Sequence, residues 1–224
     1  MKLNQKLIVS ALTFAVVAFS LSTANAATKP TRFAAFTPKT PKYILKIKRA
    51  SWRDPLFGDM GWTHSSDWGK FSTTKGKVIK ITLITKVPGL HPGITVWHRG
   101  ANDTAPDIYV QDHFYQQNAS ISEFGAKDEA TGKAIGNIFM RHIGNGYDND
   151  GHTNGYGFDD NGNKILKAPA GVKGIKDKIP GQLVLTFKAP LSGNYQFVVG
   201  GFNPIKAFDG KNKHEVTATV SVTP

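Results

Sequence analysis

Alternation of apolar and polar residues over positions 78–87 constrains the fold of this chain most strongly. Side chains two apart on a strand share a face, whereas a helix would scatter them around its axis. One face of this segment carries Ile79, Ile81, Leu83 and Val87, and the other carries Lys80, Thr82 and Lys86. The pattern predicts a half-buried β-strand that ends at Pro88-Gly89.

Several other short segments share this β character. Strands are predicted at residues 43–48, 94–97, 108–110, 182–188, 193–200 and 215–223, with Gly and Pro between them. In the fifth of these, Tyr195, Phe197 and Val199 are expected to point inward. One modest helix is predicted at 126–135, and the polar tract 144–163 is predicted to be a long loop. The fold class is therefore mainly β: a single-domain antiparallel β-sandwich-like fold with long loops and little helix.

The amino-terminal 26 residues have the pattern of a cleavable signal peptide. Lys2 and Lys6 precede an apolar stretch over 7–21, and Ala24-Asn25-Ala26 supplies small residues for cleavage. A proline-containing lead, 27–42, is expected to precede one β-rich domain, 43–224. After cleavage no transmembrane segment is expected. The mature protein is then secreted or on the outer cell surface, with the periplasm as the alternative.

The chain has no cysteine, and this narrows its chemistry considerably. Thiolate metal sites, disulfides and cysteine nucleophiles are excluded, so imidazole becomes the expected ligand for a soft metal. Recognised hydrolase, phosphate-binding and zinc-protease motifs are also missing, which favours a non-enzymatic role. The net charge of +12 is spread singly along the chain, unlike the clustered charge of a nucleic-acid-binding protein.

Four of the seven histidines have an aromatic neighbour, and one of these pairs has a suggestive spacing. Trp62 lies two residues before His64, so both side chains would project from the same face of an extended segment. An imidazole in a pocket walled by aromatic rings suits Cu(I), because restricted water and low coordination favour the reduced ion. Ordinary core packing of a tryptophan beside a histidine is the competing interpretation.

The segment Gly61-Trp62-Thr63-His64, in an exported and cysteine-free β-rich chain, resembles the MopE/CorA family. These are surface-associated copper(I)-binding proteins of methane-oxidising bacteria. The resemblance implies one Cu(I) held by two histidines and a kynurenine, the oxidation product of a tryptophan two residues before the first histidine. Carried onto this sequence, Trp62 is the kynurenine precursor and His64 the first ligand. A function in copper acquisition follows, with a surface di-haem cytochrome c peroxidase-like protein as partner.

The second histidine ligand is not fixed by a motif. His113 is the first choice, because it follows a predicted strand in an aromatic setting. His142 is the second choice and His98 the third.

The tract 144–163 also raises the question of calcium. Asp148 and Asp150 begin like an EF-hand loop, but Thr153 stands where the glycine belongs and Asp159 replaces the bidentate glutamate. A solvated loop is the simpler interpretation. A different Ca²⁺ site, using Asp148, Asp150, Asp159 or Asp160, is the alternative. It would suit a rival function, a calcium-dependent carbohydrate- or surface-binding β-sandwich with a stacking platform of exposed Trp52, Trp68 and Trp97.

Overall fold

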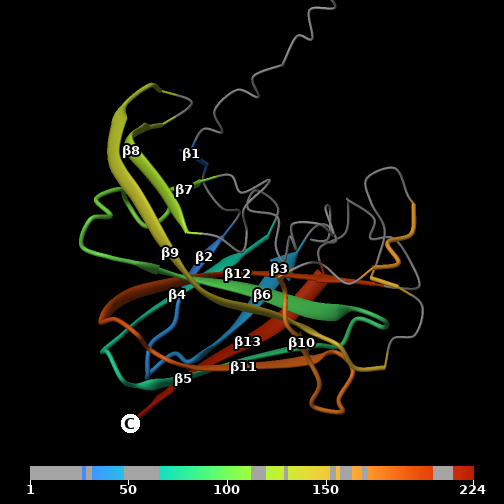
Figure 1. Cartoon of the computed structure of the whole chain (residues 1–224). Helices are drawn as coiled ribbons and strands as arrows, with labels where there is room; N and C mark the ends of the chain where they lie inside the picture. The colour runs from blue at the N-terminus through green and yellow to red at the C-terminus, as the bar shows by residue number, and fades with distance from the viewer. Residues whose placement is uncertain are drawn as a thin grey trace, which may run out of the picture.

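The computed structural model describes residues 27–28, 32–47, 66–111, 120–128, 131–151, 155–156, 163–167, 171–203 and 214–224. Strands make up the regular structure of these residues, as predicted for a mainly β chain (Figure 1). Two sheets pack face to face as a sandwich, and a third, two-stranded sheet pairs β1 (Ala27–Thr28) with β7 (Val110–Gln111). Within the described ranges there is no helix of the length and apolarity needed to cross a bilayer.

The four-stranded sheet contains the segment whose alternation is clearest. Its order is β11-β5-β13-β3, and every neighbouring pair is antiparallel. The strands are β3 (Lys42–Ile47), β5 (Val78–Thr85), β11 (Gln182–Lys188) and β13 (His214–Thr223). Ile79, Ile81 and Leu83 of β5 are fully buried, while Lys80 faces solvent. The alternation in the sequence therefore predicted both the strand and its buried face.

The seven-stranded sheet has the order β10-β9-β6-β12-β4-β2, with β8 added along β9. Its strands are β2 (Phe33–Ala35), β4 (Trp68–Thr73), β6 (His91–Arg99), β8 (Ile121–Lys127), β9 (Ala134–Asp148), β10 (Gly174–Ile175) and β12 (Gly193–Phe202). β2 belongs to the predicted proline-containing lead and pairs in parallel with β4. The next residue after β2, Phe36, is buried in the core between the two sheets. Part of the lead thus packs with the domain that follows it.

The main core lies between the two sheets. It receives Leu45 and Ile81 from the four-stranded sheet, and Tyr195, Phe197 and Val199 from β12. These three β12 side chains are fully buried, as the alternation predicted. The Phe197 ring lies directly over Gly69, so any side chain at that position would displace it.

A second apolar cluster covers the opposite, outer face of the seven-stranded sheet. It consists of the buried residues Trp68, Trp97, Ala105, Ala126, Ile138, Met140 and Val198, with Phe33, Tyr109 and Ile135 packed against them. We call this set the outer cluster. β6 is buried along its whole length, and β12 is buried from Tyr195 to Phe202, because both strands are covered on both faces. Alternation alone did not reveal this second layer.

Three predictions about local structure were wrong, wholly or in part. The helix predicted at 126–135 is instead the end of β8 and the start of β9, joined by a tight turn. Asp128 accepts hydrogen bonds from the Thr131 N–H and hydroxyl, and Gly132 adopts a φ of 67°, which favours a turn over a helix. The tract 144–163 is not wholly a loop, since β9 continues to Asp148 by pairing with β6 and β10. The strand predicted at 108–110 begins only at Val110.

Candidate metal centre

Three of the expected site residues, Trp62, His64 and His113, lie outside the described residues, as do Trp52, Asp159 and Asp160. The structure does describe the strands that lead to them. Ser66 and Asp67 immediately precede β4, and β7 ends at Gln111, two residues before His113. Trp68 and Tyr109, which stand four residues from His64 and His113 in the sequence, both pack on the outer face of the seven-stranded sheet.

Two tryptophans form the floor of this outer face. Trp68 and Trp97 are both fully buried and stack with ring centroids 5.7 Å apart and planes 22° apart. Phe33 stacks on the other side of Trp68, at 6.5 Å. An exposed platform for carbohydrate rings, which would use Trp68 and Trp97, is therefore ruled out. The platform predicted from the sequence needed both rings exposed, but the outer cluster covers them.

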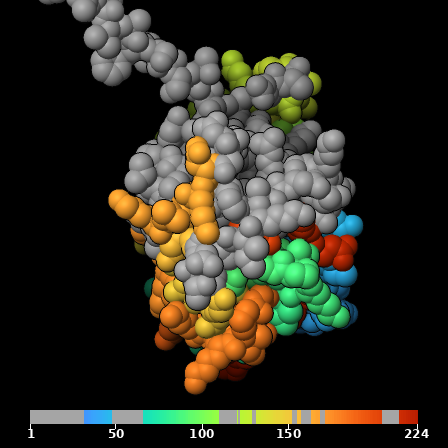
Figure 2. Space-filling view, turned by 90° about the vertical axis from the view of Figure 1, so that its right-hand side faces the viewer, coloured from blue at the N-terminus to red at the C-terminus, as the bar shows by residue number. Residues whose placement is uncertain are grey.

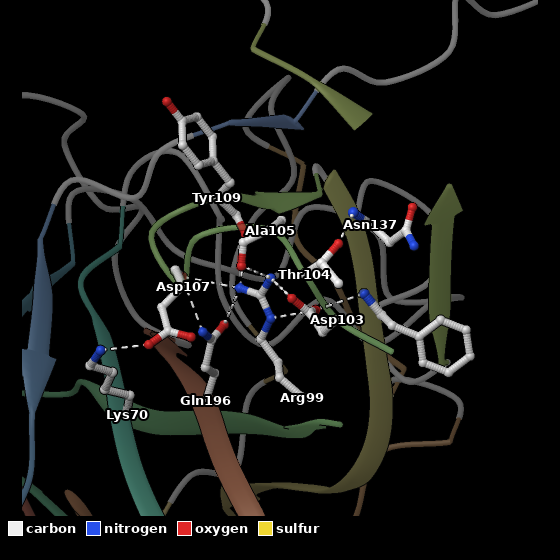
Figure 3. Close-up of polar contacts among 10 residues, drawn as sticks. Lys70, Arg99, Asp103, Thr104, Ala105, Asp107, Tyr109, Asn137 and Gln196 are labelled. Carbon is white, nitrogen blue, oxygen red and sulfur yellow. Dashed lines mark hydrogen bonds and ion pairs between the residues drawn. The ribbon is translucent and has the colours of Figure 1, made fainter. Parts of the chain in front are cut away.

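Arg99 at the end of β6 fixes the segment that runs from the outer face to β7. Its guanidinium forms a bidentate pair with Asp103, one contact of 2.6 Å being from Nε. The same group donates to the carbonyl oxygens of Asp107 and Tyr109, at 3.2 and 3.0 Å. In Figure 3 Arg99 lies at the centre of this network, next to Gln196. The buried Arg99 guanidinium thus fixes the backbone path of residues 103–109.

Further contacts tie the same segment to the sheet. Gln196 donates to the Asp107 carbonyl at 3.0 Å, and Lys70 pairs with the Asp107 carboxylate at 2.6 Å. On the other side, the backbone N–H of Phe139 donates to Asp103 at 2.7 Å. Strands β4, β9 and β12 therefore all hold the 103–109 segment, which continues into β7 and towards His113.

His142 lies on the same face of the sheet as Trp97, because a bulge changes the register of β6 and β9. Val96 pairs with Gly144, but the next pair is Trp97 with His142. Without the extra residue His142 would pair with His98, on the opposite face. Bulges commonly redirect a side chain in this way.

The His142 imidazole has the properties of a metal ligand. Its Nε2 atom is buried and has no hydrogen-bond partner. Burial lowers the pKa of His142, which keeps the ring in the neutral form that binds metals. The His142 backbone N–H donates to the hydroxyl of Ser120 at 3.1 Å, and Ser120 is the residue where the described chain resumes after 111.

His98, the third choice for a copper ligand, lies in a different environment. It faces the main core, where its ring meets Tyr195 edge-on at 5.0 Å. Its Nε2 is hydrogen-bonded to the Ser192 carbonyl at 3.0 Å. His98 and His142 therefore project from opposite faces of the sheet, and the structure does not bring them together.

Asp148 is the last residue of β9 and Asp150 follows two residues later, and the carboxylates of both accept hydrogen bonds from backbone N–H groups. Asp148 Oδ2 accepts hydrogen bonds from His91 Nδ1 at 2.8 Å and from the Gly181 N–H at 2.7 Å. Asp150 Oδ2 accepts from the N–H groups of Asp177 and Lys178, at 2.7 and 2.8 Å. Figure 2 looks onto this end of the molecule, where residues 171–181 are orange. Among the residues that the structure describes, no three His, Asp or Glu side chains gather as metal ligands.

Comparison with known proteins identifies the family. The model of the copper(I)-binding protein CorA-like family matches residues 24–209. The chain belongs to this family. Its members bind copper, and the family is one of copper-binding proteins rather than enzymes. The resemblance drawn from Trp62 and His64 is thereby confirmed at the level of the family.

Two solved structures of copper-binding proteins are similar to this chain over most of its length. One is CorA of Methylomicrobium album BG8, described as a surface-associated copper-binding protein important in copper acquisition. CorA is 33% identical to this chain, with a TM-score of 0.70. The match covers 88% of this chain and 99% of CorA. The other is the secreted protein MopE of Methylococcus capsulatus, in which an oxidised tryptophan facilitates copper binding. MopE is 18% identical to this chain, with a TM-score of 0.56. The match covers 89% of this chain and 94% of MopE. MopE therefore supports the fold alone. No curated protein matches the chain.

Proposed function

We propose that this protein binds Cu(I) outside the cytoplasm for copper acquisition, through His64, His113 and a kynurenine derived from Trp62. The outer cluster is the observation that carries this proposal. Trp68 and Tyr109 both pack in it. The chain runs four residues back from Trp68 to His64, and four residues forward from Tyr109 to His113. At about 3.5 Å per extended residue, each histidine reaches at most about 14 Å from the cluster.

His142 is the next choice for the second imidazole, and the structure supports it with an unpartnered Nε2 on the Trp97 face. His98 is a weaker choice, because its Nε2 is already hydrogen-bonded and faces the main core. We therefore propose the second ligand in the order His113, His142, His98.

The surroundings suit a reduced copper ion. The chain offers no thiolate, so imidazole nitrogens and the aryl amine of kynurenine are the donors to expect. The buried rings of Trp68 and Trp97 exclude water from the floor of the outer face, which favours low coordination. Oxidation of a tryptophan facilitates copper binding in MopE, and we propose the same role for Trp62. The protein then binds and delivers its metal without turnover.

Export follows from the signal peptide, which we propose is removed after Ala26. The family match begins at residue 24, next to this cleavage site, and CorA and MopE are described as surface-associated and secreted. Outside the cell, a surface di-haem cytochrome c peroxidase-like protein is the proposed partner. A Ca²⁺ site that uses Asp148, Asp150, Asp159 or Asp160 is kept only as the alternative to a loop without metal.

Competition between the protein and a chromophoric Cu(I) chelator tests the ligand set. Replacement of His64 by Ala should weaken Cu(I) binding by about a hundredfold or more, since one lost ligand removes several kilocalories per mole. His113→Ala should have a similar effect and His142→Ala a smaller one. His214→Ala, on β13 of the other sheet, is the matched control and should leave binding unchanged. Full affinity in the His64 variant would refute the proposal.

A further inference from the structure

A cavity lies between the two sheets, beside the ends of β4 and β13 and away from the outer cluster. Its volume is about 650 Å³, within the range of small-molecule sites. It opens to solvent and is lined by the segment 36–41 that follows β2, the end of β4 and residues 220–222 of β13. Here β13 pairs with β5 but no longer with β3, because β3 begins at Lys42, opposite Thr219. One further hydrogen bond links the two segments, from the Val220 N–H to the Pro41 carbonyl at 2.9 Å.

The interior of this cavity is apolar. Phe36, Phe71 and Val220 form its inner wall and are each at least 95% buried. Pro38 and Pro41 line another side, and both have rigid rings that need little ordering when a ligand binds. A site of this kind gains free energy from burying an apolar body of matching size.

Two polar groups, the Thr73 hydroxyl and the Lys77 ammonium, line the cavity and indicate which polar group a ligand should carry. The Thr73 hydroxyl oxygen is buried and has no hydrogen-bond partner, which is a costly arrangement in an empty site. Lys77 lines the same cavity and supplies a cation. The lining contains no Asp or Glu. By contrast, the hydroxyl of Ser72 donates to Asn194, and that of Ser221 to the Lys80 carbonyl.

We propose that this cavity binds a small amphipathic anion, with its apolar body against Phe36, Phe71 and Val220 and its anionic group on Lys77 and Thr73. Lys77 pairs with the anion, and the Thr73 hydroxyl donates a hydrogen bond to it. The site is independent of copper, because it lies between the sheets whereas the outer cluster covers the opposite face of the seven-stranded sheet. A protein of this family would thus carry an organic ligand as well as a metal.

Fluorescence titration with 8-anilino-1-naphthalenesulfonate, an aromatic probe with a sulfonate, tests this site in the full mature chain. We expect saturable binding of one probe per protein. Lys77→Met should weaken it about tenfold and Thr73→Val several-fold, as expected for the loss of charged and neutral hydrogen bonds. Lys80→Met, on the exposed face of neighbouring β5, is the matched control and should not change binding.

A second probe and a folding measurement make the result decisive. N-phenyl-1-naphthylamine has the same rings without the sulfonate, so it should bind the wild type more weakly and be insensitive to Lys77→Met. Circular dichroism and melting temperature establish that each variant is folded, because the sulfonate probe also binds partly unfolded proteins. Unsaturable binding, or equal binding by folded wild type, Lys77→Met and Thr73→Val, would overturn the proposal. Cu(I) affinity should be the same in all these variants, so the outcome is separate from that of the copper proposal.

Discussion

Trp68 and Trp97 stack face to face beneath the outer surface of the seven-stranded sheet, with ring centroids 5.7 Å apart and no solvent exposure. They are therefore structural tryptophans. Replacing Trp97 by Ala should lower the free energy of unfolding by about 3–5 kcal/mol, because a large cavity replaces the ring. Urea denaturation measures this loss. Phe124→Ala, at a side chain that is 73% exposed, is the control and should change stability by less than about 0.5 kcal/mol.

The same burial makes a prediction about oxidation. Trp68 and Trp97 are shielded from solvent, so both should remain unmodified in protein from the native host. Peptide mass spectrometry should find kynurenine at Trp62 alone among these three positions. Oxidation of Trp68 or Trp97 to the same extent would show that the modification is not directed by the metal site.

Arg99 should be the most sensitive charged residue of the outer face. Arg99→Met leaves the Asp103 carboxylate buried without its cation, which should cost about 3–5 kcal/mol of unfolding free energy. The double variant Arg99→Met/Asp103→Asn should recover part of this loss, because it removes the unpaired charge. Lys70→Met, which breaks the half-exposed pair with Asp107, should cost at most about 1 kcal/mol. Equal losses in the two single variants would contradict the network as described.

The pair of His91 and Asp148 leads to a prediction about calcium. Asp148→Asn should lower the unfolding free energy by about 1.5–3 kcal/mol, because His91 and two backbone N–H groups donate to this carboxylate. Since these hydrogen bonds already organise the end of β9, the melting temperature should be the same in Ca²⁺ and in a Ca²⁺ chelator. A large drop in chelator would instead favour the predicted calcium site.

His142 should make stability depend on pH. Burial lowers its pKa below the ordinary value of about 6.5, so the unfolded chain takes up a proton at a higher pH than the folded chain does. Stability is therefore retained above about pH 6.5 and falls as the pH decreases towards the lower pKa of the folded state. Melting temperatures of copper-free protein between pH 8 and pH 5 should fall more for the wild type than for His142→Gln. Parallel curves would show that His142 is not desolvated.

The sequence predicted the strands of the sandwich well where one face of a strand is buried and the other is exposed to solvent. The alternation of β5 and the burial of Tyr195, Phe197 and Val199 are examples. It failed where both faces are buried, because alternation then carries no information. Trp68 and Trp97 are fully buried although an exposed platform was predicted, and the long strand β9 was not predicted at all.

Local sequence also could not predict the position of His142. Its place beside Trp97 depends on a one-residue bulge between β6 and β9, and register is a property of two paired strands rather than of either segment. Most of the hydrogen bonds to the carboxylates of Asp148 and Asp150 likewise come from distant residues, such as His91 and Gly181 for Asp148 and Asp177 for Asp150. By contrast, the Trp62 and His64 spacing is local, which is why it sufficed to indicate the family.

Anomalous scattering at the copper edge, from crystals of protein purified from its native host, tests the central claim most directly. A single copper peak within bonding distance of His64, a second imidazole and an oxidised Trp62 is the predicted result, with His113 as that second imidazole. Copper bound elsewhere, or a fully ordered His64 and unmodified Trp62 with no copper beside them in copper-replete protein, would contradict it.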